Sequence, residues 1–204
     1  MEGPSILVLP VVGLSAVLAG LIAFRADLTR VPGGRILAFI ALFLLPVVAI
    51  AAGLSQQLQR SKSTQFCLSC HVMEDYGKSL LVDDKSYIPA AHFQNNRVPR
   101  DHACFTCHTN YTMYGDFNAK IRGFHHVWAQ YVTGPKLPIH LYEPYNNREC
   151  LHCHGEARVF LENPIHSAQI DDLRSNTISC LSSGCHDTIH NTGHLDEVKF
   201  WKPE

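Results

Sequence analysis

Two apolar stretches without a single charged side chain dominate the first quarter of the chain. They cover residues 5–24 and 36–54. Each is close to the roughly 20 residues that an α-helix needs to cross the hydrocarbon core of a bilayer. The pattern therefore predicts a membrane anchor, residues 1–55, with two transmembrane helices. The remaining residues, 56–204, have the length of one domain.

Charges around the apolar stretches predict their orientation. The linker between them carries three arginines, Arg25, Arg30 and Arg35, and one aspartate. By the positive-inside rule this linker lies in the cytoplasm, so the N-terminus and residues 56–204 lie outside, on the periplasmic face of a bacterial inner membrane. A cleaved signal peptide is the alternative for the first stretch, but such peptides begin with positive charge and the only charge here is Glu2.

Cysteine and histidine are confined to the second domain. All eight cysteines and all thirteen histidines follow residue 55, whereas the formal net charge of the whole chain is only -1. That balance gives no electrostatic reason to expect a nucleic-acid partner. Eight cysteines outside a membrane make a disulfide framework the first alternative to test.

The cysteines fall into four pairs, each followed by histidine. Three pairs have the spacing CxxCH, which is typical of covalent c-type haem attachment, and the fourth is CxxxxCH, with Gly184 as a permissive residue in the longer loop. Numbered one to four in chain order, these motifs contain Cys67 and Cys70, Cys104 and Cys107, Cys150 and Cys153, and Cys180 and Cys185. Disulfides or structural zinc would leave the recurring histidine unexplained. The sequence therefore predicts four c-type haems, numbered like their motifs.

Axial iron ligands are expected among the histidines. The motif histidines are His71, His108, His154 and His186. The distal ligands of three haems are expected at His92, His166 and His190, with His102, His140 and His194 in reserve; His152, between two attachment cysteines, is expected at an edge. Two histidine ligands give six-coordinate haems suited to electron transfer rather than to chemistry on a substrate.

Four features together resemble a known family. Motif one continues to Met73 as CxxCHxM, motif three is preceded by NNRE, His92 lies upstream of motif two, and a CHxxxH ends at His190. Over about residues 56–195 the chain resembles the membrane-anchored tetrahaem quinol dehydrogenases of the NapC/NirT/NrfH type. The resemblance implies that Met73 replaces His71 as a ligand of haem one, whose other face opens toward a quinol pocket. The alternative is that His71 binds iron and Met73 only packs.

Apolar positions at helical spacing predict an amphipathic helix that begins at a capping Asp116 and ends at Gly134. They are Phe117, Ile121, Phe124, Trp128, Tyr131 and Val132. Such a stripe is more often part of a core, here one packed on haem faces.

The resemblance gives this helix a role at the quinol. Lys120 matches the lysine that lines the quinol pocket in related proteins, whereas the family's aspartate is missing, because no acid occurs between Lys120 and Glu143. His125 and His126 are candidate proton acceptors in its place, the alternatives being haem ligation or exposure to solvent.

The distance from the anchor to motif one bears on access to the membrane. If Ser55–Thr64 continue the second helix, they rise about 15 Å, roughly the headgroup layer, and haem one lies at the membrane surface.

The sequence thus predicts a mostly α-helical protein with two transmembrane helices and a small, loop-rich multihaem domain. It is expected to transfer electrons from menaquinol or ubiquinol to a periplasmic redox protein or catalytic subunit. One alternative is a subunit of a larger respiratory complex that delivers electrons to the quinone pool. Another is a reductase of small molecules at an open first haem, for which no arginine and acid cluster is evident. Oligomeric state and direction of electron flow stay open.

Overall fold

The computed structural model describes residues 8–136, 139 and 144–202. The chain divides into two compact units, Met1–Ser61 and Lys62–Glu204. The described residues are mostly helical and contain no strand, only an isolated antiparallel bridge between Val82 and Phe200. The prediction of a mostly α-helical protein is confirmed.

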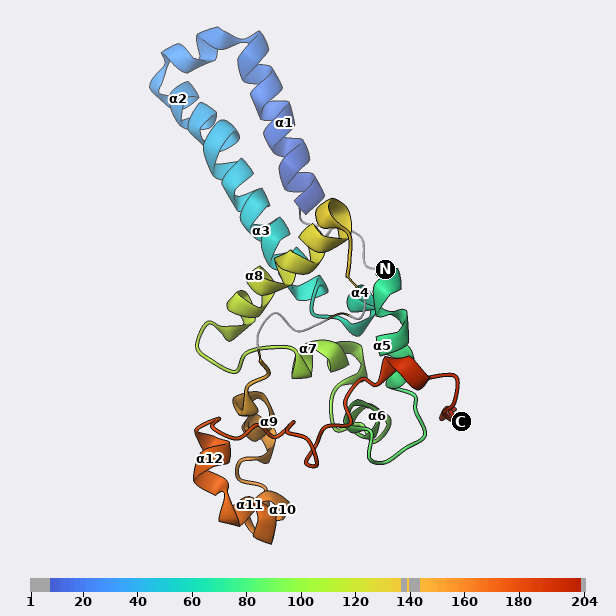
Figure 1. The fold of residues 1–204 in the computed structure, drawn as a ribbon. Helices are drawn as coiled ribbons and strands as arrows, with labels where there is room; N and C mark the ends of the chain where they lie inside the picture. The colour runs from blue at the N-terminus through green and yellow to red at the C-terminus, as the bar shows by residue number, and fades with distance from the viewer. Residues whose placement is uncertain (1–7, 137–138, 140–143, 203–204) are drawn as a thin grey trace. The chain divides into compact units, whose positions relative to one another are not determined.

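The first unit is a helical hairpin (Figure 1). Helix α1 covers Val8–Phe24, and after the short helix η1 (Ala26–Arg30) the chain returns as one continuous helix, Pro32–Arg60, made of α2 (Pro32–Phe39), η2 (Ile40–Leu44) and α3 (Leu45–Arg60). Within the described residues, Pro32–Arg60 alone is long and apolar enough to cross a membrane, and α1 is a shorter apolar helix. The helix also ends at Arg60 and does not continue to Thr64 as expected.

A widened turn in the returning helix frees a backbone carbonyl that bonds the other helix of the hairpin. Pro46 has no N–H, and its ring would press on the carbonyl one turn earlier, so the preceding turn η2 opens into a π-helix in which Leu45 N–H bonds Ile40 O. The Ala41 carbonyl accepts instead from the Ser15 hydroxyl of α1, at 2.8 Å. Ala41 is fully buried, and a small residue there allows the two backbones to approach.

The second unit is built from short helices connected by loops. In chain order they are α4 (Thr64–Cys67), η3 (His71–Met73), α5 (Glu74–Ser79), α6 (Ile88–Gln94), η4 (Arg100–His102), α7 (Ala103–Cys107), α8 (Gly115–Trp128), η5 (Ala129–Thr133), α9 (Asn147–His154), α10 (Arg158–Leu161), α11 (Pro164–Ala168), α12 (Ile170–Arg174) and η6 (Thr192–His194). The cysteines of motifs two and three lie on α7 and α9.

A small apolar cluster organises the region around α6. Its buried members are Val82, Tyr87, Ala90 and Leu195. The Tyr87 hydroxyl donates to the carbonyl of Asn191 at 2.8 Å, and the Gln94 amide donates to the carbonyls of Leu80 and Val82. The cluster thereby fixes both α6, which carries His92, and the chain next to His190.

Helix α8 differs from its prediction at one end and on one face. Asp116 lies in the first turn and does not cap the helix, whereas the predicted end is confirmed, because η5 continues α8 to Gly134, whose φ of 78° suits glycine. The apolar stripe is not a core of protein side chains. Its members Phe117, Ile121, Phe124, Trp128, Tyr131 and Val132 are between 53 and 82% exposed.

Candidate functional site

The attachment cysteines bring the four motifs together in two pairs. None of the eight forms a disulfide, and side-chain hydrogen bonds join Cys67 to Cys104 and Cys150 to Cys180. The bond from Cys104 lowers the pKa of Cys67 to about 7, and the bond from Cys150 does the same for Cys180. Motif one therefore lies beside motif two, and motif three beside motif four.

A buried threonine holds the first pair of motifs. Thr64 begins α4, and its hydroxyl accepts from the backbone N–H of Ala103, the first residue of α7, at 2.8 Å. Ser63 caps α4 by accepting from Phe66 N–H. Nothing in the local sequence indicated this contact, because its partners are 39 residues apart.

A buried asparagine holds the second pair. Asn147, 1% exposed, begins α9 and donates to the carbonyls of Leu173 and Ile178 at 2.8 and 2.6 Å, while its side-chain oxygen accepts from Cys180 N–H at 2.8 Å. Its amide thus hydrogen-bonds two carbonyls of the chain before motif four and the N–H of the first cysteine of that motif. This explains a polar residue in the NNRE segment.

The longer loop of motif four closes as predicted. Gly184 has a φ of 81°, and the N–H of His186 bonds the carbonyl of Cys180 at 3.1 Å. The N–H of Gly184 also bonds the Asp187 carboxylate at 2.9 Å. The two extra residues are thus accommodated by a turn for which glycine is suited.

Three motif histidines each face one of the three histidines that were predicted to be distal ligands. His108 and His190 have ring centres 6.2 Å apart, and His92 and His154 have ring centres 5.9 Å apart. For His166 and His186 the distance is 6.0 Å. The planes meet at 19°, 87° and 41°, and rotation about a shared axis permits any of these angles.

These distances fit an iron ion between each pair of rings. A metal–imidazole bond of about 2.0–2.1 Å, plus roughly 1.1 Å from ring nitrogen to ring centre, separates two trans imidazoles by about 6 Å. His92 is also in a suitable tautomer, because its Nδ1 lies 2.8 Å from the Ile88 carbonyl, which can only accept. Nδ1 therefore carries the proton and Nε2 keeps its lone pair.

The electrostatics of the histidines suit the same role. Burial lowers the pKa of His190 to about 4, and desolvation lowers the pKa of His108 and of His154. Nδ1 of His166 is buried without a hydrogen-bond partner among the described residues. Neutral imidazoles are what iron ligation requires.

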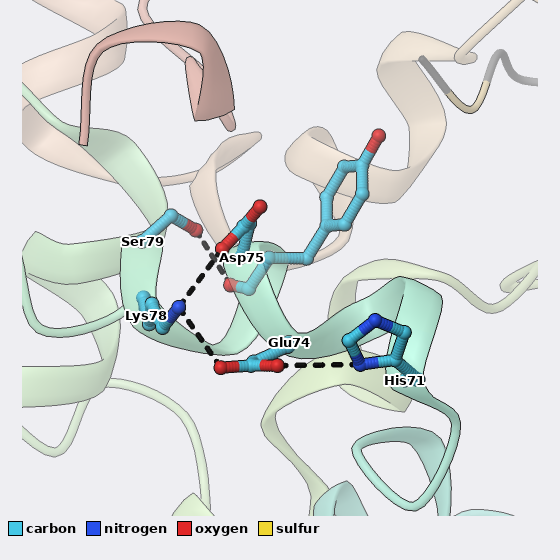
Figure 2. Close-up of polar contacts among 6 residues, drawn as sticks. His71, Glu74, Asp75, Lys78 and Ser79 are labelled. Atoms are coloured by element: carbon cyan, nitrogen blue, oxygen red, sulfur yellow. Dashed lines mark hydrogen bonds and ion pairs between the residues drawn. The ribbon is translucent and has the colours of Figure 1, made fainter. Parts of the chain in front are cut away.

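His71 is different from the other three motif histidines. Its side chain is 92% exposed, and Nδ1 lies 3.4 Å from Glu74, which bonds Lys78 at 2.9 Å; Lys78 in turn bonds Asp75 at 3.1 Å (Figure 2). The bond from Lys78 lowers the pKa of Glu74. Met73, two residues further, is half-buried and directly precedes α5.

Lys120 lies in a cluster of charge and aromatic surface. Its ammonium is 4.2 Å from the ring centre of Phe105, and that of Lys62 is 5.3 Å from the same ring. Asp116, one turn before Lys120, bonds Lys62 at 2.5 Å and Thr109 at 3.2 Å. Burial lowers the pKa of Lys120, and the Cys67 thiol is close enough to oppose that shift. Lys120 is thus near Cys67 of motif one.

Asp116 is the site residue that sequence reasoning missed. Its position just before an apolar stripe is typical of a helix cap, and Lys62 is 54 residues away. The bond from Lys62 lowers the pKa of Asp116. The only hint in the sequence was its spacing of four residues from Lys120, which places both on one face of a helix.

The two adjacent histidines of α8 also have defined surroundings. Burial lowers the pKa of His126, and His125 adds to that shift. His126 is close enough to His108 to lower its pKa further. His126 therefore lies on the side of α8 near motif two.

Comparison with protein families decides the kind of protein. The chain matches the model of the NapC/NirT cytochrome c family, N-terminal region, over residues 34–195. The chain belongs to this family. A comparison with curated proteins gave no match, and a comparison with solved structures gave none either. Family membership shows a multihaem c-type cytochrome of electron transport, with covalently bound haem.

Other histidines of this NapC/NirT cytochrome have different partners. His102 lies 2.9 Å from Asp101, and His194 lies 3.7 Å from Glu197, with side chains 44 and 64% exposed. His152 stacks on Tyr111, with ring centres 3.8 Å apart. His140 lies outside the described residues.

Proposed function

We propose that this protein oxidises membrane quinol beside motif one and delivers the electrons singly to a periplasmic redox protein. One observation carries the proposal. Three motif histidines each face a second imidazole, whereas Nδ1 of His71 lies 3.4 Å from the Glu74 carboxylate. That asymmetry supports one haem of a different kind, with an open face, next to three that only carry electrons.

Each haem would be held by its own motif. Haem one would be attached to Cys67 and Cys70 with Met73 as a ligand. The other ligand pairs would be His108 with His190 for haem two, His154 with His92 for haem three, and His186 with His166 for haem four. When bound, the haems supply reversible one-electron oxidation and reduction, and a thioether ligand raises the potential of haem one relative to haems with two histidines.

Residues near Cys67 would bind the quinol. Two O–H bonds of the quinol break on oxidation, releasing two electrons and two protons. Lys120 would contact a quinol oxygen, and the half-buried Phe105, whose ring centre lies 4.2 Å from the Lys120 ammonium, would contact the quinol ring. His126 would accept a proton, because its lowered pKa keeps it neutral near pH 7. Asp116 would hold Lys62 in position.

The membrane arrangement is part of the proposal. Pro32–Arg60 would cross the bilayer, and α1 would be the second span of the anchor. The exposed apolar stripe of α8 and η5 includes Trp128 and Tyr131, residue types enriched at membrane surfaces. Contact of this stripe with lipid would let an apolar quinol reach Lys120 from the bilayer.

Stopped-flow reduction tests the function. The detergent-purified, oxidised protein is mixed with a menaquinol analogue, and the haem α-band is followed. Rapid reduction is expected, and Lys120→Leu should slow it at least tenfold with all four haems in place. Lys136→Leu, which changes an exposed lysine beyond η5, is the control and should reduce at the normal rate.

Two results would contradict the proposal. Absence of reduction in the haem-loaded protein would favour a carrier inside a larger respiratory complex, with electrons entering elsewhere. Normal reduction of Lys120→Leu would remove Lys120 from the quinol site.

A further inference from the structure

A buried hydroxyl lies directly behind the imidazole of His190. Ser79 is the last residue of α5 and is fully buried. Its Oγ lies 2.7 Å from Nδ1 of His190 and 2.6 Å from the backbone carbonyl of Tyr76, a contact drawn in Figure 2. These partners come from segments 111 residues apart, so the contact is tertiary.

The direction of both hydrogen bonds follows from counting protons. A serine hydroxyl has one hydrogen, and a carbonyl oxygen has none to offer. The Tyr76 contact therefore uses the Ser79 hydrogen, and Oγ must accept from the N–H at Nδ1 of His190. The opposite assignment would leave two acceptor oxygens 2.6 Å apart with no hydrogen between them. The proton of His190 is thus fixed on Nδ1, and Nε2 keeps its lone pair.

Other contacts hold the same imidazole. The Tyr76 ring meets it edge-on at 5.5 Å, and the Tyr87 hydroxyl bonds the carbonyl of the next residue, Asn191. On another side the ring centre of His108 lies 6.2 Å away, with the two ring planes at 19°. The ring is therefore oriented by contacts that do not depend on a bound group.

We propose that Ser79 is a positioning residue that fixes the tautomer of His190 and lowers the potential of haem two. A ligand imidazole whose other nitrogen donates a hydrogen bond is a stronger donor to the metal. Stronger donation stabilises the oxidised iron, so the hydrogen bond to Ser79 holds the potential down. This inference rests on the ligation of haem two by His190 within the proposed function.

Potentials of the full-length, haem-loaded protein in detergent test the inference. In Ser79→Ala, which removes only a buried hydroxyl, all four haems should remain and one potential should shift upward in a spectroelectrochemical titration. The low-spin electron paramagnetic resonance signal of the same haem should change. Ser79→Thr should restore both, since threonine keeps the hydroxyl. Ser61→Ala, which removes another hydroxyl bonded to a carbonyl three residues earlier, should change neither.

Each outcome decides the inference. Unchanged potentials and spectra in Ser79→Ala would overturn it, as would a loss of haem two that Ser79→Thr does not repair. A shift repaired by threonine supports it. His190→Ala separately tests the ligation, because retention of three haems with two histidine ligands in that variant would reject His190 as a ligand whatever Ser79 does. Failure of the quinol reaction in the wild-type protein would leave the Ser79 result standing.

Discussion

His71 and Met73 are the two candidate iron ligands of motif one, and their surroundings differ. The exposed imidazole lies 3.4 Å from the Glu74 carboxylate near the start of α5, whereas the thioether is half-buried just before that helix. Sulfur is the softer ligand and favours reduced iron more than imidazole does. Assigning the thioether to iron accounts for an imidazole that faces a carboxylate instead of a second ring.

Met73→His tests this assignment. The potential of haem one should fall toward those of the other three, because imidazole replaces a thioether, and absorption from iron–methionine ligation should disappear from the near-infrared spectrum. Val72→His, next to Met73, is a control for the added imidazole. A near-infrared spectrum identical to wild type in Met73→His would mean that His71 binds iron.

Several site residues could be predicted from sequence because chemistry requires them locally. Spacing alone indicated the cysteine pairs and the permissive Gly184, and position relative to the motifs indicated His92, His166 and His190. Their pairing could not be predicted. His108 meets His190, 82 positions later in the chain, only because α6 and the Tyr87 contact fix that segment. Their roles as ligands stay predictions.

Helices α4, α7 and α9 are too short to be stable alone. Each is held by a buried polar side chain or cap. The hydrogen bonds of Thr64 and Asn147 hold the two motif pairs together, a role that a hydrophobic core has in larger domains. These contacts join residues 26 to 39 positions apart, so no periodicity reveals them. For α8 the sequence predicted the helix from the spacing of its apolar stripe, but it did not predict what covers that stripe.

Asn147→Ala should weaken the attachment of motif four to α9. It leaves two carbonyls and the Cys180 N–H without partners, at about 1–3 kcal/mol each if they stay buried. We expect a lower thermal midpoint and partial loss of haem four, measured by scanning calorimetry and by the mass of the intact protein. Asn146→Ala, which removes only the cap of α9, is the matched control and should be milder. Equal effects of the two variants would show that the hydrogen bonds of the Asn147 side chain do not hold motif four to α9.

At the scale of the whole molecule, the family match supports a membrane anchor joined to a multihaem cytochrome domain. The described part of the second unit has one small apolar cluster, which is little for its length. Length and composition predicted this division. Of the two predicted spans, the described helices support one, because Pro32–Arg60 has 29 residues, whereas α1 has 17.

Labelling of introduced cysteines tests the orientation. A membrane-impermeant maleimide added to intact spheroplasts should label Lys85→Cys in the second unit but label Ala26→Cys, in the arginine-rich linker, only after the membrane is permeabilised. The native cysteines would be linked to haem and silent. Labelling of Ala26→Cys in intact cells would place the linker outside and reverse the predicted topology.

The length of helix α5 is constrained by the residues at its two ends, Met73 and Ser79. It follows Met73 directly and ends at Ser79, a rise of about 9 Å, and each residue of an α-helix turns the next by about 100°. A single inserted or deleted residue would swing Ser79 away from His190 while leaving every motif intact. Related chains should therefore tolerate substitutions on the exposed face of α5 far more readily than insertions. The number of residues in α5 should set the distance between the first two haems.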